Sequence, residues 1–349
     1  MGIYLWALPL MFVLGSLIVI RRSGSSVPSK ATLDTVRTDV SLYRVCLMVI
    51  TWLCILTVDF RVFPRRYAKT ETYGTSLMDL GVGSFVLADA FVSRQARHPS
   101  TFNLLSALST TSPLILIGFG RLVSTSGVDY QVHVGEYGVH WNFFFTLAAV
   151  AVLSSLINVP PQYCGILGSL ILVGYQFSLN NGLNTYLLSS DIGSSIISQN
   201  KEDATIFSSK IGCLQISKER HGQEEKFGLL HFFWLLAILL NQHVERVSHR
   251  MCNLSYVTLV GAVNLQWLAI LMLSDYVPGS SSPILEDAFN RNLLASFLVA
   301  NVLTGLVNLS FDTLFASTTT ALLILSAYLY LLSVIAGTLE FYGVRSKFW

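Results

Sequence analysis

The chain has 349 residues, of which 52% are hydrophobic and only 12% are charged, and its formal net charge is +2. Soluble domains contain about 25% charged residues, so the composition excludes a soluble globular protein and indicates a membrane protein with many spans. The small net charge also argues against nucleic-acid binding. Basic residues are instead expected to set membrane orientation or to contact lipid headgroups.

Apolar runs follow one another along the chain, and a bilayer-crossing helix needs about 20 such residues. The first run, 3–20, lacks a cationic start and a small-residue cleavage site, so we expect an uncleaved span. The run 229–247 is the weakest, because polar residues follow a short apolar part. We predict an all-α, polytopic bundle of nine or ten transmembrane helices in a single membrane-embedded domain, 1–349. The other runs are 41–59, 76–93, 103–123, 141–159, 163–180, 254–273, 293–311 and 314–338.

A polar stretch at 190–227 interrupts this pattern. Its part 201–226 holds ten charged residues and shows no lasting amphipathic period. We therefore expect a poorly ordered polar loop there. The five cysteines show no CxxC or Cys/His spacing, so no metal site is predicted.

The stretch VDFRVFPRRYAKTETYGTSLMDLG, residues 58–81, places acidic residues and four cations between two apolar runs. A second group of cations, at 21–44, lies on the other side of the same predicted span. The positive-inside rule cannot be satisfied at both ends of one helix. The cations of 58–81 are therefore the better candidates for a role other than orientation.

Asp59 and Lys69 are the candidate catalytic residues of this stretch. Pro64 disfavours helix, so the chain can fold back and bring Lys69 toward Asp59. A carboxylate beside a lysine suits proton abstraction from a hydroxyl, with the lysine orienting the base or stabilising an oxyanion. Arg65 and Arg66 offer forked donors for the phosphate of a lipid or of coenzyme A. The alternative is that these cations only anchor the loop to anionic headgroups.

Further candidates lie beside the predicted spans. Asp79 stands where acids are costly and often functional, although it could instead lie at the membrane interface. The glycines of GVG at 81–83 follow no strand, so they indicate close helix packing rather than a dinucleotide loop. His140 stands where a loop enters a span, which suits an interfacial or a catalytic histidine.

A polar stripe is predicted on the helix at 293–311. Its members recur at three- or four-residue spacing and so share one helix face, which should meet other helices or a cavity rather than lipid. Hydrogen bonding between helices is the alternative to a functional role. The members are Asn301, Thr304, Asn308 and Asp312.

Several of these segments carry a resemblance to a known family. VDF followed by FPRRYAKTETYGTSLMDLGVGSFV resembles the signature of the glucosaminyl-phosphatidylinositol inositol acyltransferases, the PIG-W family. The resemblance covers about residues 35–202 and 244–349, and the residue choices are similar to those of plant members. Further matching blocks are YGVHWNFFFT, IISQNKE, VSHRMCNLSYV, NLLASFLVANVLTGLVNLSFDT and the terminal KFW.

The resemblance implies a multi-span protein of the endoplasmic reticulum membrane. Such proteins transfer a palmitoyl-type chain from acyl-CoA, a co-substrate, to the inositol hydroxyl of glucosaminyl-phosphatidylinositol in GPI-anchor biosynthesis; no cofactor is implied. The essential acid and lysine of the family correspond to Asp59 and Lys69, and no acyl-enzyme is required. The residues expected to bind substrate are Arg65, Arg66, Glu71, Asp79, His140, Asn142, Asn308 and Asp312.

The chain also departs from the family pattern. Family members begin well before it and continue with apolar sequence where this chain has the polar run 203–226, so we expect a shortened member. Two other hypotheses stay open. One is a transporter of phospholipids or GPI intermediates, which an inverted internal repeat would favour, although none is evident. The other is a non-catalytic shortened form.

Overall fold

The computed structural model describes residues 31–92, 104–125, 142–156, 161–189, 223–274 and 284–344. These residues form helices joined by loops and contain no strand, which confirms the all-α class. The predicted span 3–20, His140 and most of the predicted polar loop lie outside the described residues. The last residues of that loop belong to a helix, because α12 begins at Gln223.

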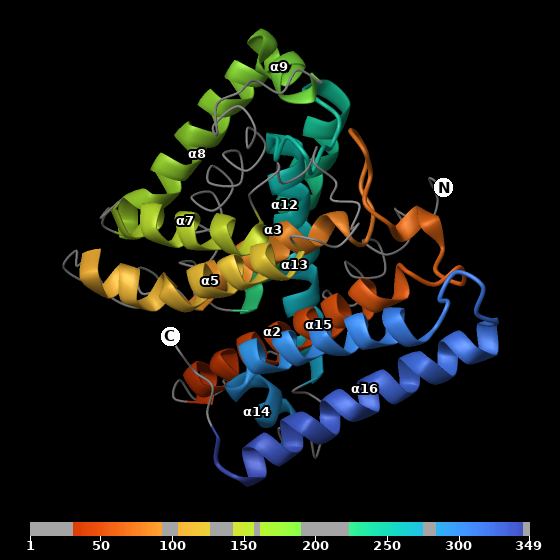
Figure 1. Cartoon of the computed structure of the whole chain (residues 1–349). Coiled ribbons are helices and arrows are strands. Elements are labelled where there is room, and N and C mark those ends of the chain that lie inside the picture. The colour runs from red at the N-terminus through yellow and green to blue at the C-terminus, as the bar shows by residue number, and fades with distance from the viewer. Residues whose placement is uncertain are drawn as a thin grey trace.

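Figure 1 shows the helices in order along the chain. A 3₁₀ turn (Arg65–Tyr67) lies between α2 and α3, and a π-helical break (Leu179–Leu183) separates α8 from α9. The α-helices are α2 (Ala31–Thr57), α3 (Asp79–Val92), α5 (Leu104–Thr125), α7 (Phe143–Leu156), α8 (Pro161–Ser178), α9 (Asn184–Leu188), α12 (Gln223–His243), α13 (Leu254–Ser274), α14 (Ile284–Arg291), α15 (Leu293–Ser310) and α16 (Thr318–Phe341).

Four of the described helices are long and apolar enough to cross a membrane, against the nine or ten spans predicted for the whole chain. They are Val40–Thr57, Leu254–Leu271, Leu293–Ser310 and Thr318–Phe341, and they match four predicted runs. The predicted runs 76–93 and 141–159 form shorter helices, α3 and α7, of 14 residues each. In α3 the reason is local, because capping at Ser76 starts the helix at Asp79.

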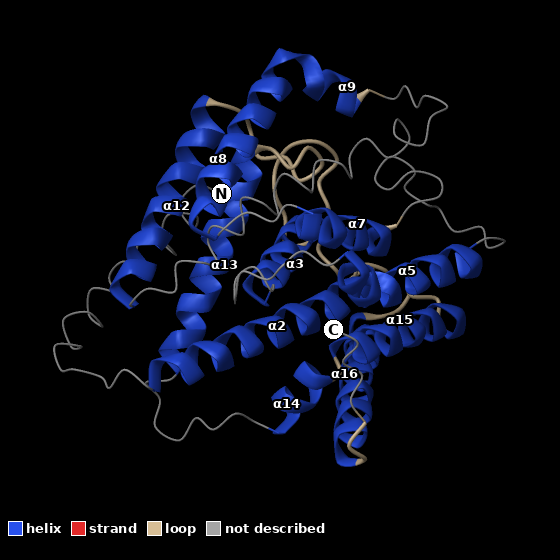
Figure 2. Ribbon diagram, turned by 90° about the vertical axis from the view of Figure 1, so that its left-hand side faces the viewer, coloured by secondary structure: helices blue, strands red, loops and turns tan. Residues whose placement is uncertain are grey.

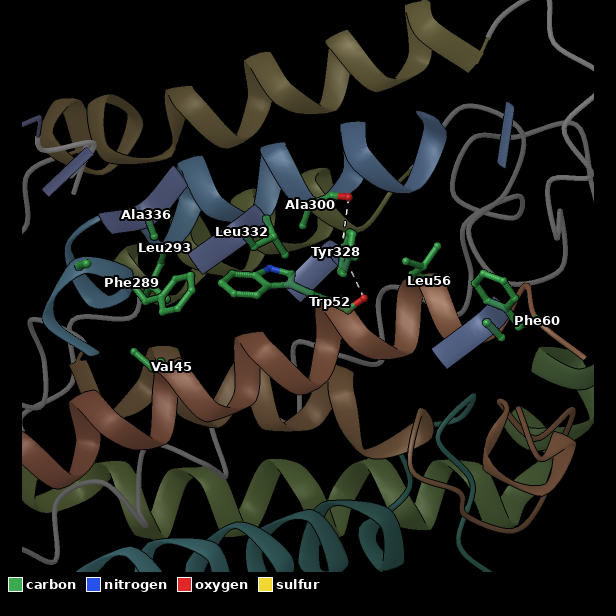
Figure 3. Close-up of a cluster of buried hydrophobic side chains, with 12 residues drawn as sticks. Val45, Trp52, Leu56, Phe60, Phe289, Leu293, Ala300, Tyr328, Leu332 and Ala336 are labelled. Atoms are coloured by element: carbon green, nitrogen blue, oxygen red, sulfur yellow. Dashed lines mark hydrogen bonds between the residues drawn. The ribbon is translucent and has the colours of Figure 1, made fainter. Parts of the chain in front are cut away.

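One apolar core joins α2, α14, α15 and α16, and Figure 3 shows its side chains. Trp52 of α2 is fully buried at its centre, with its ring 5.2 Å from that of Phe289. The hydroxyl of Tyr328, on α16, points to the backbone oxygens of Trp52 and Ala300, at 3.4 and 3.3 Å. Burying these rings stabilises the packing of α16 across α2 and α15.

A second core joins α3 to α13. A Cβ added at Gly83 would lie 2.8 Å from Cγ2 of Val260 and 3.0 Å from the Tyr256 hydroxyl. The close packing predicted for 81–83 is therefore confirmed at Gly83, whereas a Cβ at Gly81 would meet no atom within 4 Å. Tyr43 ties α2 to this core, because its hydroxyl donates to Oδ1 of Asn264 at 2.6 Å.

The helices α5 and α7 lie side by side in both Figure 1 and Figure 2. A Cβ at Gly118 would lie 2.6 Å from Cε1 of Phe145, so the glycine allows the close approach of the two helices. The neighbouring Phe144 meets Phe297 of α15, with ring centroids 5.8 Å apart. This contact connects the α5–α7 pair to the helix that carries Asn308.

Candidate active site

The candidate site is built around the loop 58–78, which joins α2 to α3 and is called the signature loop below (Figure 1, orange). Pro64 is followed by the single 3₁₀ turn Arg65–Tyr67, in which the Tyr67 N–H donates to the Pro64 oxygen at 2.9 Å. The loop then returns on itself, because the Met78 N–H donates to the Tyr67 oxygen at 3.2 Å. This turn closes the part of the loop after Pro64, between Tyr67 and Met78; the approach of Lys69 to Asp59 that Pro64 would allow stays a prediction.

Asp59 stands at the start of this loop and is held on both sides. The next residue, Phe60, is fully buried in the core of α2 and α16 (Figure 3). Oδ2 of Asp59 accepts a hydrogen bond of 2.8 Å from Nδ2 of Asn308, on α15. Among the described residues, no hydrogen-bond donor reaches Oδ1. The structure thus joins two residues that the sequence suggested separately, one as a base and one in a polar stripe.

Lys69 lies half-buried in the same loop. Among the described residues, the Asp59 carboxylate accepts its hydrogen bond from Asn308, and the approach of Lys69 to Asp59 stays a prediction. What fixes the backbone beside Lys69 is Thr70. Its N–H donates to Oδ1 of Asp79 and its hydroxyl donates to Oδ2 of Asp79, each at 3.0 Å.

Asp79 is fully buried, and its carboxylate collects four polar partners. Besides the two donors of Thr70, the Ser76 N–H donates to Oδ2 at 2.7 Å. The fourth partner is Nδ1 of His249, which lies 3.0 Å from Oδ1. The Asp79 N–H in turn donates to the Ser76 hydroxyl at 3.4 Å, which completes a capping box at the start of α3. A buried carboxylate needs such a full set of donors.

His249 belongs to the segment 244–253, which connects α12 to α13 and is called the docking segment below. This segment binds the signature loop through its backbone as well. The Gly74 N–H donates to the Val247 oxygen at 2.8 Å, and the Ser248 hydroxyl donates to the Thr72 oxygen at 2.5 Å. Thr70, Thr72 and Gly74 alternate along the loop, so three points of contact fasten it to 247–249.

The docking segment is itself ordered by buried amides. Asn253 is fully buried; its Oδ1 accepts the N–H groups of Ser248 and Tyr256, and its Nδ2 donates to the Arg246 oxygen at 2.7 Å. Cys252 adopts a φ of 44°, which is uncommon for a residue with a side chain. The segment therefore turns sharply before α13 begins, and this turn presents His249 to Asp79.

Glu245 links the docking segment to α8 and to the signature loop. Its carboxylate accepts hydrogen bonds from Nε2 of Gln176 at 2.8 Å and from Nδ2 of Asn253 at 3.3 Å. The Tyr73 hydroxyl also donates to it, at 3.3 Å. Partial burial, together with the negative charge of Glu245, raises the pKa of Tyr73 above its ordinary value. The phenol of Tyr73 therefore stays a donor at neutral pH.

The other predicted substrate-binding residues are distributed around this site. The exposed Arg66 places its guanidinium 5.0 Å from the ring centroid of Tyr67, and Arg65 belongs to the same 3₁₀ turn. The exposed Glu71 offers its backbone oxygen to Nη1 of Arg250 at 3.5 Å. Asp312 is exposed and lies beyond the end of α15 at Ser310, so it does not continue the polar stripe of that helix.

Asn142 is distant in sequence from these residues and has a structural role. Its Oδ1 accepts the N–H groups of Phe144 and Phe145, so it caps the start of α7. Its Nδ2 donates to the Gly118 oxygen of α5 at 2.9 Å. The substrate contact predicted for Asn142 stays a prediction. Within the polar stripe, Thr304 is buried and donates to the Ala300 oxygen of its own helix.

Reasoning from single residues missed His249. A lone histidine in a polar loop carries no recognisable spacing to an aspartate 170 positions earlier, and only the backbone contacts of the two loops bring them together. The signal that could have found it is the block VSHRMCNLSYV, which contains His249 and resembles the family. Within the described ranges, no group of three or more His, Cys, Asp and Glu side chains could hold a metal ion.

Known proteins resemble the chain over most of its length. The GWT1 family model matches residues 2–339. An uncharacterized protein of Arabidopsis thaliana is 55% identical over 90% of this chain and 76% of its own. Glucosaminyl-phosphatidylinositol-acyltransferase PIGW of Bos taurus is 33% identical over 89% of this chain and 75% of its own. GPI-anchored wall transfer protein 1 of Aspergillus fumigatus is 35% identical over 87% of this chain and 72% of its own. The chain belongs to the GWT1 family.

Proposed function

We propose that the chain is an acyltransferase of GPI-anchor biosynthesis. It transfers a fatty acyl chain, of the palmitoyl type, from acyl-CoA to the inositol hydroxyl of glucosaminyl-phosphatidylinositol in the endoplasmic reticulum membrane. The bovine relative, matched over most of its length, is named for glucosaminyl-phosphatidylinositol acyl transfer. The observation in the structure that best supports the proposal is the Asp59–Asn308 hydrogen bond, because it orients a carboxylate at the start of the loop that carries Lys69.

The proposed reaction follows from the two oxygens of Asp59. Asn308 holds Oδ2, so Oδ1 accepts the proton of the inositol hydroxyl as that hydroxyl attacks the thioester carbonyl. The new C–O bond forms first and gives a tetrahedral intermediate. As this intermediate collapses, the C–S bond breaks, and coenzyme A leaves as a thiolate that takes up the proton from Asp59. The ammonium of Lys69 stabilises the oxyanion of the tetrahedral intermediate.

Both substrates carry phosphates, for which the cations of the signature loop offer binding groups. Arg66 is exposed beside Tyr67, so its forked donors can reach a phosphate of the lipid headgroup or of coenzyme A. Arg250 approaches the same loop from the docking segment. The loop that carries Lys69 thus holds an exposed arginine of its own, Arg66, and is contacted by Arg250 of the docking segment.

The direct test expresses the chain in cells that lack their own inositol acyltransferase. Membranes from these cells receive glucosaminyl-phosphatidylinositol and isotope-labelled palmitoyl-CoA, and the acylated lipid is measured by mass spectrometry. We expect labelled product with the unchanged chain and a loss of at least about 100-fold with Asp59→Asn, which keeps the shape but removes the base. Asp287→Asn, at an exposed carboxylate of α14, is the matched control.

The outcomes separate the hypotheses. Labelled product that requires palmitoyl-CoA and Asp59 supports acyl transfer. A well-expressed chain that yields no acylated lipid contradicts the proposal. If that chain still moves the lipid between leaflets without acyl-CoA, it is a transporter instead.

A further inference from the structure

Asp79 and His249 form a buried acid–imidazole pair that the proposed chemistry does not use. The Asp79 side chain is 0% exposed and that of His249 is 9% exposed, with Oδ1 and Nδ1 3.0 Å apart. Because Nδ1 faces a carboxylate oxygen, it carries a proton and donates it to Asp79. The carboxylate loses its hydration on burial, so this donor replaces part of the lost water.

The pair connects directly to the residue beside Lys69. Thr70 gives both its N–H and its hydroxyl to the same carboxylate, at 3.0 Å each. The hydroxyl also lies 3.4 Å from Nδ1 of His249. Because Thr70 makes two hydrogen bonds to the Asp79 carboxylate, both the position and the orientation of the Thr70 backbone are fixed. The backbone at Lys69 is therefore held, through Thr70, by Asp79, which lies ten residues further along the chain, and by His249 of the docking segment.

Asp79 has a local role in addition, since it completes the capping box at the start of α3. That role needs only Ser76 and Asp79, and both belong to one stretch of chain. His249 adds nothing to the cap. The cap therefore does not require His249, and His249 is the donor to Asp79 that comes from the docking segment.

The docking segment reinforces the same geometry. The Ser248 hydroxyl donates to the Thr72 oxygen, and the Val247 oxygen accepts the Gly74 N–H. These contacts bind the signature loop two and four residues after Thr70. The loop is thus bound to the docking segment after Lys69, whereas before it the chain passes through the 3₁₀ turn Arg65–Tyr67, in which Arg66 and Tyr67 are exposed. The Asp79–His249 pair therefore acts on the chain immediately after Lys69, where the loop is bound to the docking segment.

We propose that Asp79 and His249 are positioning residues, which hold the Thr70 backbone so that the Lys69 ammonium lies where the thioester oxyanion forms. This inference rests on the proposed acyl transfer and names two residues that support it. Neither residue touches the reacting atoms. Loosening the pair lets Lys69 move away from the reacting carbonyl, and a displacement of about 1 Å can lower a rate 100-fold.

The test compares His249→Ala with His249→Asn in the full chain. The asparagine can still donate to Asp79 from a position close to that of Nδ1, whereas the alanine cannot. With palmitoyl-CoA and glucosaminyl-phosphatidylinositol as substrates, His249→Ala should lower kcat about 10- to 100-fold while KM for palmitoyl-CoA stays near its original value. His249→Asn should recover most of the lost kcat. His243→Ala, at an exposed histidine of α12, is the matched control.

A second measurement does not depend on activity. Hydrogen–deuterium exchange of the purified chain should be slow in the peptide around Thr70–Gly74 and should become faster in His249→Ala, with α15 and α16 unchanged. An unchanged kcat in His249→Ala would overturn the inference. So would a loss of activity matched by an equal loss of folded protein, because that pattern indicates a structural role only.

The two proposals fail in different ways. If the unchanged chain shows no acyl transfer, the proposed function fails, and the exchange experiment still decides whether the pair holds the loop. If acyl transfer is present but exchange and kcat are both unaffected by His249→Ala, the proposed function survives and the positioning role is rejected.

Discussion

Nδ2 of Asn308 donates a hydrogen bond of 2.8 Å to Oδ2 of Asp59, across 249 positions of sequence. This bond joins the end of α2 to α15 at the carboxylate with the proposed role of base. It orients the side chain without adding a charge, so the carboxylate keeps an oxygen for the incoming hydroxyl.

Replacing Asn308 tests the orientation of Asp59. Asn308→Ala removes the donor and should lower kcat about 10-fold, the cost of a hydrogen bond to a charged group. Asn308→Asp should do more harm, because a second carboxylate beside Asp59 raises the pKa of the pair and keeps one proton on it. Acylated lipid formed per folded protein is the measurement.

The matched control for this pair is Asn301→Ala. Asn301 is exposed on the same helix, and among the described residues its Nδ2 donates to the Phe297 oxygen of its own helix. Its removal should leave acyl transfer unchanged. Equal activity in Asn301→Ala and Asn308→Ala would show that the contact with Asp59 has no part in the reaction.

The long apolar helices could be predicted from the sequence because a bilayer span depends on length and hydropathy alone. The runs 41–59, 254–273, 293–311 and 314–338 therefore correspond to α2, α13, α15 and α16. The helix α14 was missed, because eight residues with charges at both ends show too little pattern to distinguish from a loop. The described part of α3 begins at Asp79, three residues into the predicted run 76–93, after the capping contacts between Ser76 and Asp79.

The candidate site could be predicted only in part. Asp59 and Lys69 share a short stretch whose mixture of charges between spans is informative by itself. Asn308 was found through helical spacing, but its partner was not, since spacing on one helix does not identify what faces it. His249 depends on two loops docking against each other, and no local propensity encodes that contact. A contact between two loops that lie far apart in the chain therefore could not be predicted from the sequence.

Gly83 provides a test of the packing that supports Asp79. In Gly83→Ala the new Cβ would lie 2.8 Å from Val260 and 3.0 Å from the Tyr256 hydroxyl, which donates to the Asp79 backbone oxygen. We expect a loss of about 1–3 kcal/mol in stability, as for other overpacked sites, with lower acyl transfer. Unfolding of the purified chain in detergent measures the first effect.

Gly81→Ala is the control for this change. It lies two residues away on the same helix, and a Cβ there meets nothing within 4 Å. It should match the unchanged chain or exceed it slightly, because alanine favours helix over glycine. The packing argument would be contradicted if both substitutions gave the same stability.

Tyr328 and Trp52 test the core that holds Phe60 and thus the start of the signature loop. Tyr328→Phe removes a hydroxyl with two backbone acceptors, at 3.4 and 3.3 Å, and should cost about 1 kcal/mol. Trp52→Ala should cost about 3–5 kcal/mol through the cavity it leaves. Trp52→Phe should cost less, because Nε1 of Trp52 has no hydrogen-bond partner among the described residues.

These costs are read from thermal unfolding in detergent. Tyr330→Phe, on the same helix but 72% exposed, is the control and should leave the midpoint unchanged. A midpoint for Trp52→Ala equal to that of the control would show that this cluster does not stabilise the fold.

Thr70 tests whether the Lys69 backbone is held through its neighbour. Thr70→Ser keeps the hydroxyl that donates to Oδ2 of Asp79 and should keep most of the activity. Thr70→Val keeps the branched shape but removes the donor, so it leaves one carboxylate oxygen with fewer partners; kcat should fall about 10-fold. Both variants retain the N–H bond to Oδ1, which limits the loss.

The double variant Thr70→Val with His249→Ala tests whether Thr70 and His249 position Lys69 through one shared contact or through separate contacts. Both changes remove a donor from the same buried carboxylate, so their effects on kcat should not add. Once one donor is gone and the loop has loosened, removing the other should cost less than it does in the unchanged chain. Fully additive losses would mean that Thr70 and His249 act on Lys69 through independent contacts, and the pair would then not position it as one unit.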